Sequence, residues 1–406
     1  MKRFTLLLVL FLSLLSNVVY SQLYSFKNYN YKEGLSYSNI QDIVQTDDGN
    51  IWLASEEGGL IKFNGKTFQE IQYNNLNLDN IVSISKAKDN SLFFASKNKG
   101  IYKISNGKTN LVYQNKRQSS NYSGVFSLNN GMVFVFNKTI LIYKGDKIVS
   151  QKRLSSKFEE IKPFDFIPIK NGGILLTNIG GFYISEKTNE ISFLSNYTNE
   201  LENKVFKTGY FKQNKIHLFT ENLEEYCEIL INENGNFENK SSFKSQSPLW
   251  NNDKVTASTY IAATDKYYLV SKNGIIYTFK NGKFHEIQSN TNEKPVSCSK
   301  VISDIYGDLW LSSKIRGLYR VSIEPFTKIE INPLYSSSLT SLYFKTANGS
   351  TIISTESGQT HISSQKSKDE FISYNFHTLS AVEFDGIAYL GTSHGVKSYD
   401  PIKAKI

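Results

Sequence analysis

Short apolar runs alternate with polar turn residues along almost the whole chain. The stretch "TDDGNIWLASEEGGLIKFNGKTF", residues 46–68, shows the unit of this pattern: an Asp-Gly-Asn turn, an apolar run, a Gly-containing turn, a second apolar run and an Asn-Gly turn. Short runs bounded by Gly, Asn and Asp are typical of β-strands joined by tight turns. The pattern therefore predicts neighbouring strands of one antiparallel sheet.

The same unit recurs along the chain. Aligned on the turn residue before the apolar run, successive copies lie 41, 41, 41, 42, 52, 41, 42 and 37 residues apart. Four runs can be marked in each copy, and four strands per 40–45 residues is the spacing of a β-propeller blade. The sequence thus predicts an all-β propeller of about nine four-stranded repeats. The aligned turn residues are Gly49, Asn90, Gly131, Gly172, Asn214, Lys266, Gly307, Gly349 and Gly386.

The second strand of each unit is almost continuously apolar, as in Ile51–Ala54 and Leu309–Leu311. Such runs indicate strands buried on both faces, as expected between two neighbouring blades. We therefore expect Trp52 and Trp310 to pack in the core rather than to stack on a ligand. A glycine that recurs before the third strand predicts a positive φ or a close backbone approach. It stands at Gly100, Gly181, Gly274, Gly317, Gly358 and Gly395.

Two arrangements of the nine repeats fit the sequence. In the slightly favoured one, residues 22–406 form a single closed ring in which the lone strand at 24–29 pairs with residues 396–399 of the last repeat, which lacks a fourth strand. In the alternative, residues 22–332 form a seven-bladed propeller and residues 333–406 are two blades of an incomplete second one. Propellers typically have four to eight blades, and the sequence alone leaves the choice open.

The first residues predict export. Lys2 and Arg3 precede an apolar run from Phe4 to Leu15. Val19-Tyr20-Ser21 follows and places a small residue, Ser21, at the expected cleavage position. This is the layout of a signal peptide over residues 1–21, too short for a membrane span. No later stretch approaches the length of a transmembrane helix, so the mature chain is expected to be periplasmic or secreted.

Composition adds little to this assignment. The net charge of +9 falls to +7 when Lys2 and Arg3 leave with the signal peptide, and it is spread along the chain. Nucleic acid is therefore not an expected partner. Cys227 and Cys298 are the two cysteines of the chain, and they fall in the fifth and seventh repeats, so we expect two separate thiols rather than a disulfide.

Residues 29–68 resemble the two-component regulator propeller repeat. The matching features are Gly34-Leu35-Ser36, Asp48-Gly49-Asn50, Ile51-Trp52-Leu53 and Gly59-Leu60, and the unit around Trp310 matches well. The family comprises sensor regions of bacterial membrane histidine kinases and hybrid systems that often respond to polysaccharide fragments. The resemblance implies a sensor-type propeller with an oligosaccharide ligand and a membrane histidine kinase, or another protein, as partner. The chain itself contains no kinase or DNA-binding region.

A search for catalytic chemistry finds little. The five histidines are scattered over different repeats without metal-ligand spacing, so neither a metal site nor a cofactor is expected. No nucleophile elbow or phosphate-binding loop is present. The turns between the second and third strands carry several basic residues that a propeller would gather on one face, where they could attract anions. This predicts ligand-binding residues Lys97, Lys99, Lys272, Lys314 and Arg316.

Three functions remain open on the sequence. The first is an exported, non-enzymatic sensor propeller that binds a carbohydrate or a protein partner in two-component signalling. The second is a propeller enzyme acting on glycans, which would need acid and base groups converging on the mouth of the channel. The third is a structural scaffold. The side chains at the channel mouth distinguish the first two, because an enzyme needs clustered acid and base groups there.

Overall fold

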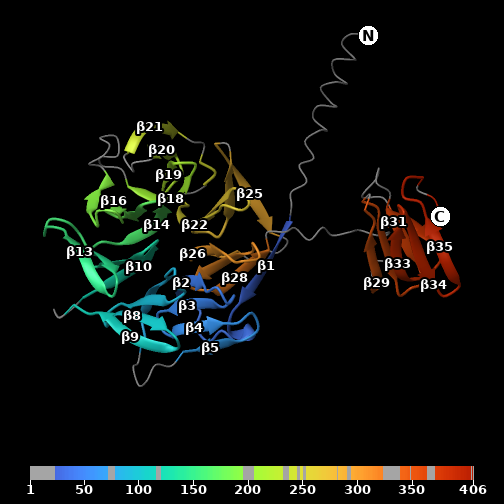
Figure 1. The fold of residues 1–406 in the computed structure, drawn as a ribbon, viewed down its shortest axis with the longest axis horizontal. Coiled ribbons are helices and arrows are strands. Elements are labelled where there is room, and N and C mark those ends of the chain that lie inside the picture. Colours follow the sequence, from blue (N-terminus) through green and yellow to red (C-terminus); the bar gives the residue numbers. More distant parts are fainter. Residues whose placement is uncertain are drawn as a thin grey trace, which may run out of the picture. The chain divides into compact units, whose positions relative to one another are not determined.

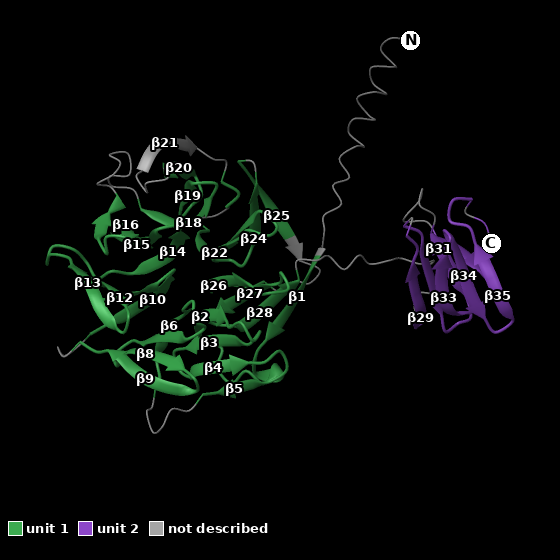
Figure 2. Ribbon diagram, in the orientation of Figure 1, with its two compact units in different colours: residues 1–325 green, residues 326–406 purple. Residues whose placement is uncertain are grey.

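A computed structural model describes residues 23–71, 78–115, 120–194, 205–231, 237–244, 247–249, 253–280, 282–289, 294–322, 339–347, 349–363, 371–403 and 405. The predicted signal peptide and the predicted boundary at 332 lie outside these residues. The chain divides into two compact units, residues 1–325 and 326–406 (Figure 2). Each unit is described by itself.

The described residues of 40–322 form seven sheets, each with its strands in sequence order from the inner edge outwards, and strand β1 (Leu23–Tyr29) joins the last two into one eight-stranded sheet. The first four sheets are β2 to β5 (Ile40–Gln45, Ile51–Ser55, Gly59–Phe63, Phe68–Glu70), β6 to β9 (Ile81–Lys86, Leu92–Ser96, Gly100–Ser105, Lys108–Tyr113), β10 to β13 (Tyr122–Leu128, Gly131–Phe136, Thr139–Lys144, Lys147–Arg153) and β14 to β17 (Pro163–Ile169, Gly172–Thr177, Gly180–Ser185, Ile191–Phe193). The next three are β18 to β21 (Phe206–Lys212, Lys215–Thr220, Glu225–Ile231, Phe237–Lys244), β22 to β25 (Val255–Ile261, Lys266–Ser271, Ile276–Lys280, Lys283–Ser289) and β26 to β28 (Cys298–Ser303, Leu309–Ser313, Gly317–Ser322).

These seven sheets form a ring among themselves. The inner strands β2, β6, β10, β14, β18, β22 and β26 each lie against the next, and β26 lies against β2 (Figure 1). The β-propeller fold predicted from the repeat is therefore confirmed. The favoured single ring of nine sheets is not what the described strands form, because the contact between β26 and β2 leaves no place for two further sheets.

Strand β1 (Leu23–Tyr29) supplies the outer strand of the seventh sheet. It pairs antiparallel with β28, with Phe26 opposite Val321 and Tyr29 opposite Leu318, and its first two residues also pair with β25. The expected pairing with residues 396–399 is thus wrong. Among the described residues, β28 is not followed by a fourth strand of its own sheet, so its outer edge can accept β1. It also belongs to the same compact unit as β1. A 3-10 turn, η1 (Tyr31–Glu33), leads from β1 towards β2.

The apolar second strands are buried as predicted. All five residues of β7 are buried, and so are all five of β27. The Trp310 ring is buried, stacks on Tyr29 at a centroid distance of 5.6 Å and donates from Nε1 to Asp304 at 2.8 Å. Trp52 is half-buried against the neighbouring sheet, and its Nε1 donates to Thr46 at 3.1 Å. Both tryptophans are therefore part of the packing between sheets.

The recurring glycine has the predicted backbone role at Gly317. Its φ is +79°, and a Cβ there would lie 2.5 Å from the carbonyl oxygen of Tyr29. A larger residue would thus push strand β1 away. Cys227 and Cys298 are not joined in a disulfide, as expected, and both are buried, in β20 and β26. Burial raises the pKa of the Cys298 thiol to about 12.

The unit of residues 326–406 contains two further sheets. The first has strands β29 (Thr340–Lys345), β30 (Thr351–Thr355), β31 (Thr360–Ser363) and β32 (Phe371–Tyr374), and the second has β33 (Thr378–Phe384), β34 (Ile387–Thr392) and β35 (Gly395–Tyr399). Among the described residues, no helix is long and apolar enough to cross a membrane.

Candidate functional site

The turns between second and third strands share one face of the ring with the segments that lead into each inner strand, because successive strands run in opposite directions. We call this face the entry face. The residue just after the second strand is tied there to its neighbours by backbone hydrogen bonds. Lys97 N–H donates to Asn80 at 2.9 Å, and Lys97 C=O accepts from Tyr122 N–H of the next sheet at 2.9 Å.

The five predicted basic residues lie on this face, at two different positions of their turns. Lys97, Lys272 and Lys314 each follow a second strand directly, and their backbone N–H groups all donate to the segment entering the same sheet, at 2.9, 2.7 and 3.1 Å. Lys99 and Arg316 lie two residues further along their turns. The Lys99 ammonium is 2.6 Å from the Asp79 carboxylate, which locally neutralises its charge. The five residues therefore lie on one face of the ring, as the sequence predicted. Of the five, only Lys314 belongs to the charged cluster described below.

Every inner strand has a β-bulge just after its first residue, in the seven sheets of the ring and in the two further sheets. A bulge re-aims the side chain of its extra residue. In the fourth and fifth sheets the bulged residues are Phe164 and Lys207, and they meet: the Lys207 Nζ lies 3.7 Å from the centre of the Phe164 ring. The bulges thus place an aromatic ring and a cation beside each other at the entry-face end of the channel.

Lys207 is the centre of a group of charged side chains. Its side chain is 19% exposed, and its Nζ is 3.8 Å from the Glu221 carboxylate. The other oxygen of that carboxylate is 2.8 Å from the Lys254 Nζ. Lys314 is near enough for its charge to act on Lys207. We call Lys207, Lys254, Lys314, Glu221 and Phe164 the mouth cluster.

The mouth cluster has an excess of positive charge, with three lysines and one carboxylate. Burial lowers the pKa of Lys207, and the charges of Lys314 and Lys254 lower it further, although the carboxylates of Glu221 and Asp165 oppose them. A partly buried ammonium that is destabilised by like charges gains most from an added anion. The cluster is therefore suited to bind a carboxylate or sulfate group.

Below the mouth, the channel is filled by a hydrogen-bonded polar layer. The residues that follow the bulges include Asp42, Asp165 and Lys300, with 3.9 Å between the Lys300 Nζ and Asp165. The Asp165 carboxylate also accepts from Thr208 Oγ1 at 2.8 Å and from Ser258 Oγ at 3.4 Å. The cavity lined by Asp165, Thr208, Ser258 and Lys300, and also by Phe164 and Lys207 of the mouth cluster, has about 10 Å³ of free space, which is at most the room for one water molecule. Nothing larger than a water molecule therefore fits between these residues.

Asp42 is held by the neighbouring sheet in the same layer. Its Oδ2 accepts from Ser83 Oγ at 3.0 Å and from Ile84 N–H at 2.9 Å. Burial raises the pKa of this carboxyl, and the positive charge of Lys300 opposes that rise. These contacts join two adjacent sheets, so the carboxylates of the layer serve the packing of the ring.

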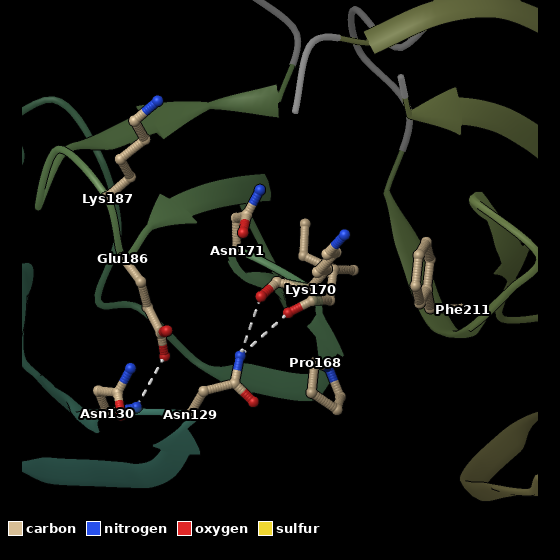
Figure 3. Close-up of a pocket in the computed structure, with 9 residues that line it drawn as sticks. Asn129, Asn130, Pro168, Lys170, Asn171, Glu186, Lys187 and Phe211 are labelled. Carbon is tan, nitrogen blue, oxygen red and sulfur yellow. Dashed lines mark hydrogen bonds between the residues drawn. The ribbon is translucent and has the colours of Figure 1, made fainter. Parts of the chain in front are cut away.

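Hollows border the described part of the ring on both faces. One, of about 650 Å³, adjoins the mouth cluster through Glu221 and Lys254 and is otherwise lined by residues such as Leu249 and Asp253. Another, of about 600 Å³, lies on the opposite face between the turns at Asn129–Asn130 and Lys170–Asn171 (Figure 3). In it, Glu186 accepts from the Asn130 N–H at 3.2 Å. The first hollow gives a ligand held at the mouth cluster further room on the entry face.

Part of this site could have been found in the sequence. Asp42, Asp165 and Lys300 each stand seven residues before the aligned turn residue of their repeats, and so does Lys207, before Asn214. Charges at one position of the inner strands were therefore a readable signal for all four residues. Phe164 stands one position earlier in its repeat and was missed because a bulge, which leaves no mark in composition or alternation, decides where it points. Among the described residues, no group of three or more His, Cys, Asp or Glu could hold a metal ion.

Comparisons with known proteins agree with the fold. Residues 34–57 match the family model described as two component regulator propeller, which confirms the resemblance seen there. A comparison of the sequence with curated proteins finds no match.

Several solved structures are similar to the chain. The extracellular domain of a hybrid two component system from B. thetaiotaomicron has 15% identity and a TM-score of 0.54, over 93% of this chain and 53% of that domain. The extracellular domain of a one component system from the same organism has 12% identity and a TM-score of 0.53, over 95% and 53%. Virginiamycin B lyase from Staphylococcus aureus has 15% identity and a TM-score of 0.56, over 74% and 99%. The chain thus spans about half the length of the first two, and these identities bear on the fold alone.

Proposed function

We propose that this chain is an exported, sensor-type propeller of a two-component system that binds an acidic oligosaccharide at the mouth cluster and catalyses no reaction. The observation that carries the proposal is the half-buried Lys207, set among Lys254 and Lys314 at the end of the channel. The Phe164 ring beside it offers an apolar surface of the kind that packs against a sugar ring. Export and signalling are supported by the signal-peptide pattern and by the sensor-domain resemblance.

A binding role fits the chemistry of the channel better than catalysis. Acid–base work on a glycosidic bond needs two carboxyl groups that flank the substrate. Here Asp42 and Asp165 accept hydrogen bonds from neighbouring sheets, and the cavity beside Asp165 has about 10 Å³ of free space. The Glu221 carboxylate of the mouth cluster is paired with two lysines. A membrane histidine kinase is the partner that we propose reads the bound state.

Titration calorimetry with uronate-bearing and neutral oligosaccharides of equal length tests the proposal. Lys207→Gln should weaken binding of the uronate ligand by roughly ten- to a hundredfold, the usual range for a lost charge-assisted hydrogen bond. The matched control is Lys212→Gln, a lysine of the same strand that pairs at 2.6 Å with Asp265. Higher salt should weaken binding to the wild type more than to Lys207→Gln. Equal affinity for acidic and neutral sugars would refute the ligand class, and binding of neither would refute the sensor role for sugars.

A further inference from the structure

The ammonium group of Lys207 is held only loosely by its neighbours. Its ion pair with Glu221 has an Nζ–O distance of 3.8 Å, which is too long for a hydrogen bond. Two other lysines of the ring have much shorter pairs: 2.8 Å separates Lys254 Nζ from the Glu221 carboxylate, and 2.6 Å separates Lys212 Nζ from the Asp265 carboxylate. Glu221 therefore holds Lys254 more tightly than it holds Lys207.

The surroundings of Lys207 increase the share of its neutral amine. The side chain is 19% exposed, and burial lowers the pKa of Lys207, as do the positive charges of Lys314 and Lys254. The two neighbouring carboxylates, and the Phe164 ring whose centre lies 3.7 Å from Nζ, act in the opposite direction. Burial and like charge outweigh the carboxylates, so Lys207 is neutral more often than a lysine on the open surface.

A neutral lysine amine is a nucleophile that adds to carbonyl groups. Proteins activate such a lysine by partial burial or by placing another cation beside it. Lys207 has both features. Lys212 of the same strand has neither, because it is 32% exposed and is held by a carboxylate at 2.6 Å. Lys207 is therefore suited to attack the carbonyl carbon of a ligand at the mouth.

The neighbouring lysines favour a ligand with a carboxylate beside that carbonyl. Lys207 and Lys254 approach different oxygens of the one Glu221 carboxylate, at 3.8 and 2.8 Å, so one small ligand can reach both amino groups. Lys314 adds a third positive charge, which leaves an excess for a ligand anion. In a 2-oxo acid the carbonyl carbon is bonded directly to the carboxylate. This class thus offers an anion to the two flanking lysines and an electrophile to Lys207.

We propose that Lys207 captures 2-oxo acids at the mouth cluster as a reversible imine. The neutral amine forms a C–N bond to the carbonyl carbon, and the C=O π bond breaks as its oxygen takes up a proton. The hydroxyl group then leaves and the C=N bond forms. The two protons that the nitrogen loses leave with the oxygen as water, so no oxidant or reductant is needed. Glu221, 3.8 Å from Nζ, can relay one of these protons. This capture rests on the anion site of the proposed function and involves no turnover.

Reductive trapping on the full exported chain tests the capture. Cyanoborohydride reduces an imine to a stable secondary amine, so incubation with pyruvate should place the first adduct of each chain on Lys207, as mapped by peptide mass spectrometry. Acetone, a ketone without a carboxylate, gives the comparison: the ratio of Lys207 to Lys212 labelling should be severalfold higher with pyruvate. Labelling without preference for Lys207, or equal ratios with the two ketones, would overturn the inference.

Lys207→Arg separates the imine from the anion site, because arginine keeps the positive charge but forms no imine. This variant should lose the preferred adduct and still bind the uronate-bearing oligosaccharide. The matched control, Lys212→Arg, should be labelled at Lys207 as the wild type is. A first adduct that forms at the wild-type rate in Lys207→Arg would contradict the assignment. The mapping on the wild type decides the question even if Lys207→Arg does not fold.

The imine and the proposed function fail in different ways. Binding of uronate-bearing oligosaccharides without a pyruvate adduct on Lys207 would refute the imine and leave the proposed function intact. A preferred adduct on Lys207 without uronate binding would support the imine and refute the oligosaccharide as ligand.

Discussion

Replacing Tyr29 by alanine should strongly destabilise the seven-sheet ring. Tyr29 ends strand β1, is 6% exposed and has its ring 5.6 Å from Trp310, 5.2 Å from Phe63 and 6.0 Å from Phe68. These partners belong to the first and seventh sheets, so this one ring packs where the circle of sheets closes. Removing a buried aromatic side chain of this size costs about 3–5 kcal/mol in the free energy of unfolding.

Urea unfolding followed by tryptophan fluorescence measures this cost selectively. The three tryptophans of the chain, Trp52, Trp250 and Trp310, all precede residue 326, so the signal reports on the first unit alone. The control is Tyr31→Ala, two residues further on and 76% exposed, for which the change should stay within about 0.5 kcal/mol. If Tyr29→Ala cost no more than this control, β1 would contribute nothing to closure, and the role assigned to its pairing with β28 would be wrong.

Three further outcomes follow from burial and charge. Trp310→Ala should cost about 3–5 kcal/mol and half-buried Trp52→Ala less, as read from the same unfolding curves. Cys298, whose pKa is raised to about 12, should not react with a disulfide reagent at pH 8 until urea unfolds the ring. Because burial raises the pKa of Asp42, its contribution to stability is fully present below about pH 3.8 and is lost as the pH rises through the raised value. The stability of wild type relative to Asp42→Asn should therefore increase as the pH falls, and a pH-independent difference would refute this.

The repeated part of the fold could be predicted from the sequence, because each unit carries its own signals. The turn at Asp48-Gly49-Asn50 and the apolar run at 51–54 specify the end of strand β2 and strand β3 locally, and the same signals return every 41 or 42 residues in most repeats. Ring closure could not be predicted in this way. Among the described residues, neither β28 nor β35 is followed in sequence by a fourth strand of its own sheet, and the pairing of β1 with β28 depends on tertiary packing of residues such as Tyr29.

The candidate site, like the fold, could be predicted only in part from the sequence. Turn position placed Lys314 on the entry face correctly, since the direction of each strand decides on which face a turn lies. It could not show that the charge of Lys314 acts on Lys207, which comes from an inner strand and is turned by a bulge. A search for charged turns therefore finds the face of a propeller, and finding the site on it requires the geometry of the inner strands.

The mouth cluster depends on the closure of the whole ring. It draws Phe164, Lys207, Glu221, Lys254 and Lys314 from four sheets, the fourth to the seventh, so its geometry depends on the contacts that hold those sheets in place, Tyr29 among them. Ligand binding should therefore be weakened in Tyr29→Ala under conditions in which that variant is partly unfolded. Titration calorimetry at a temperature at which the variant is fully folded should give the wild-type affinity, and a lower affinity there would refute a role of Tyr29 in closure alone.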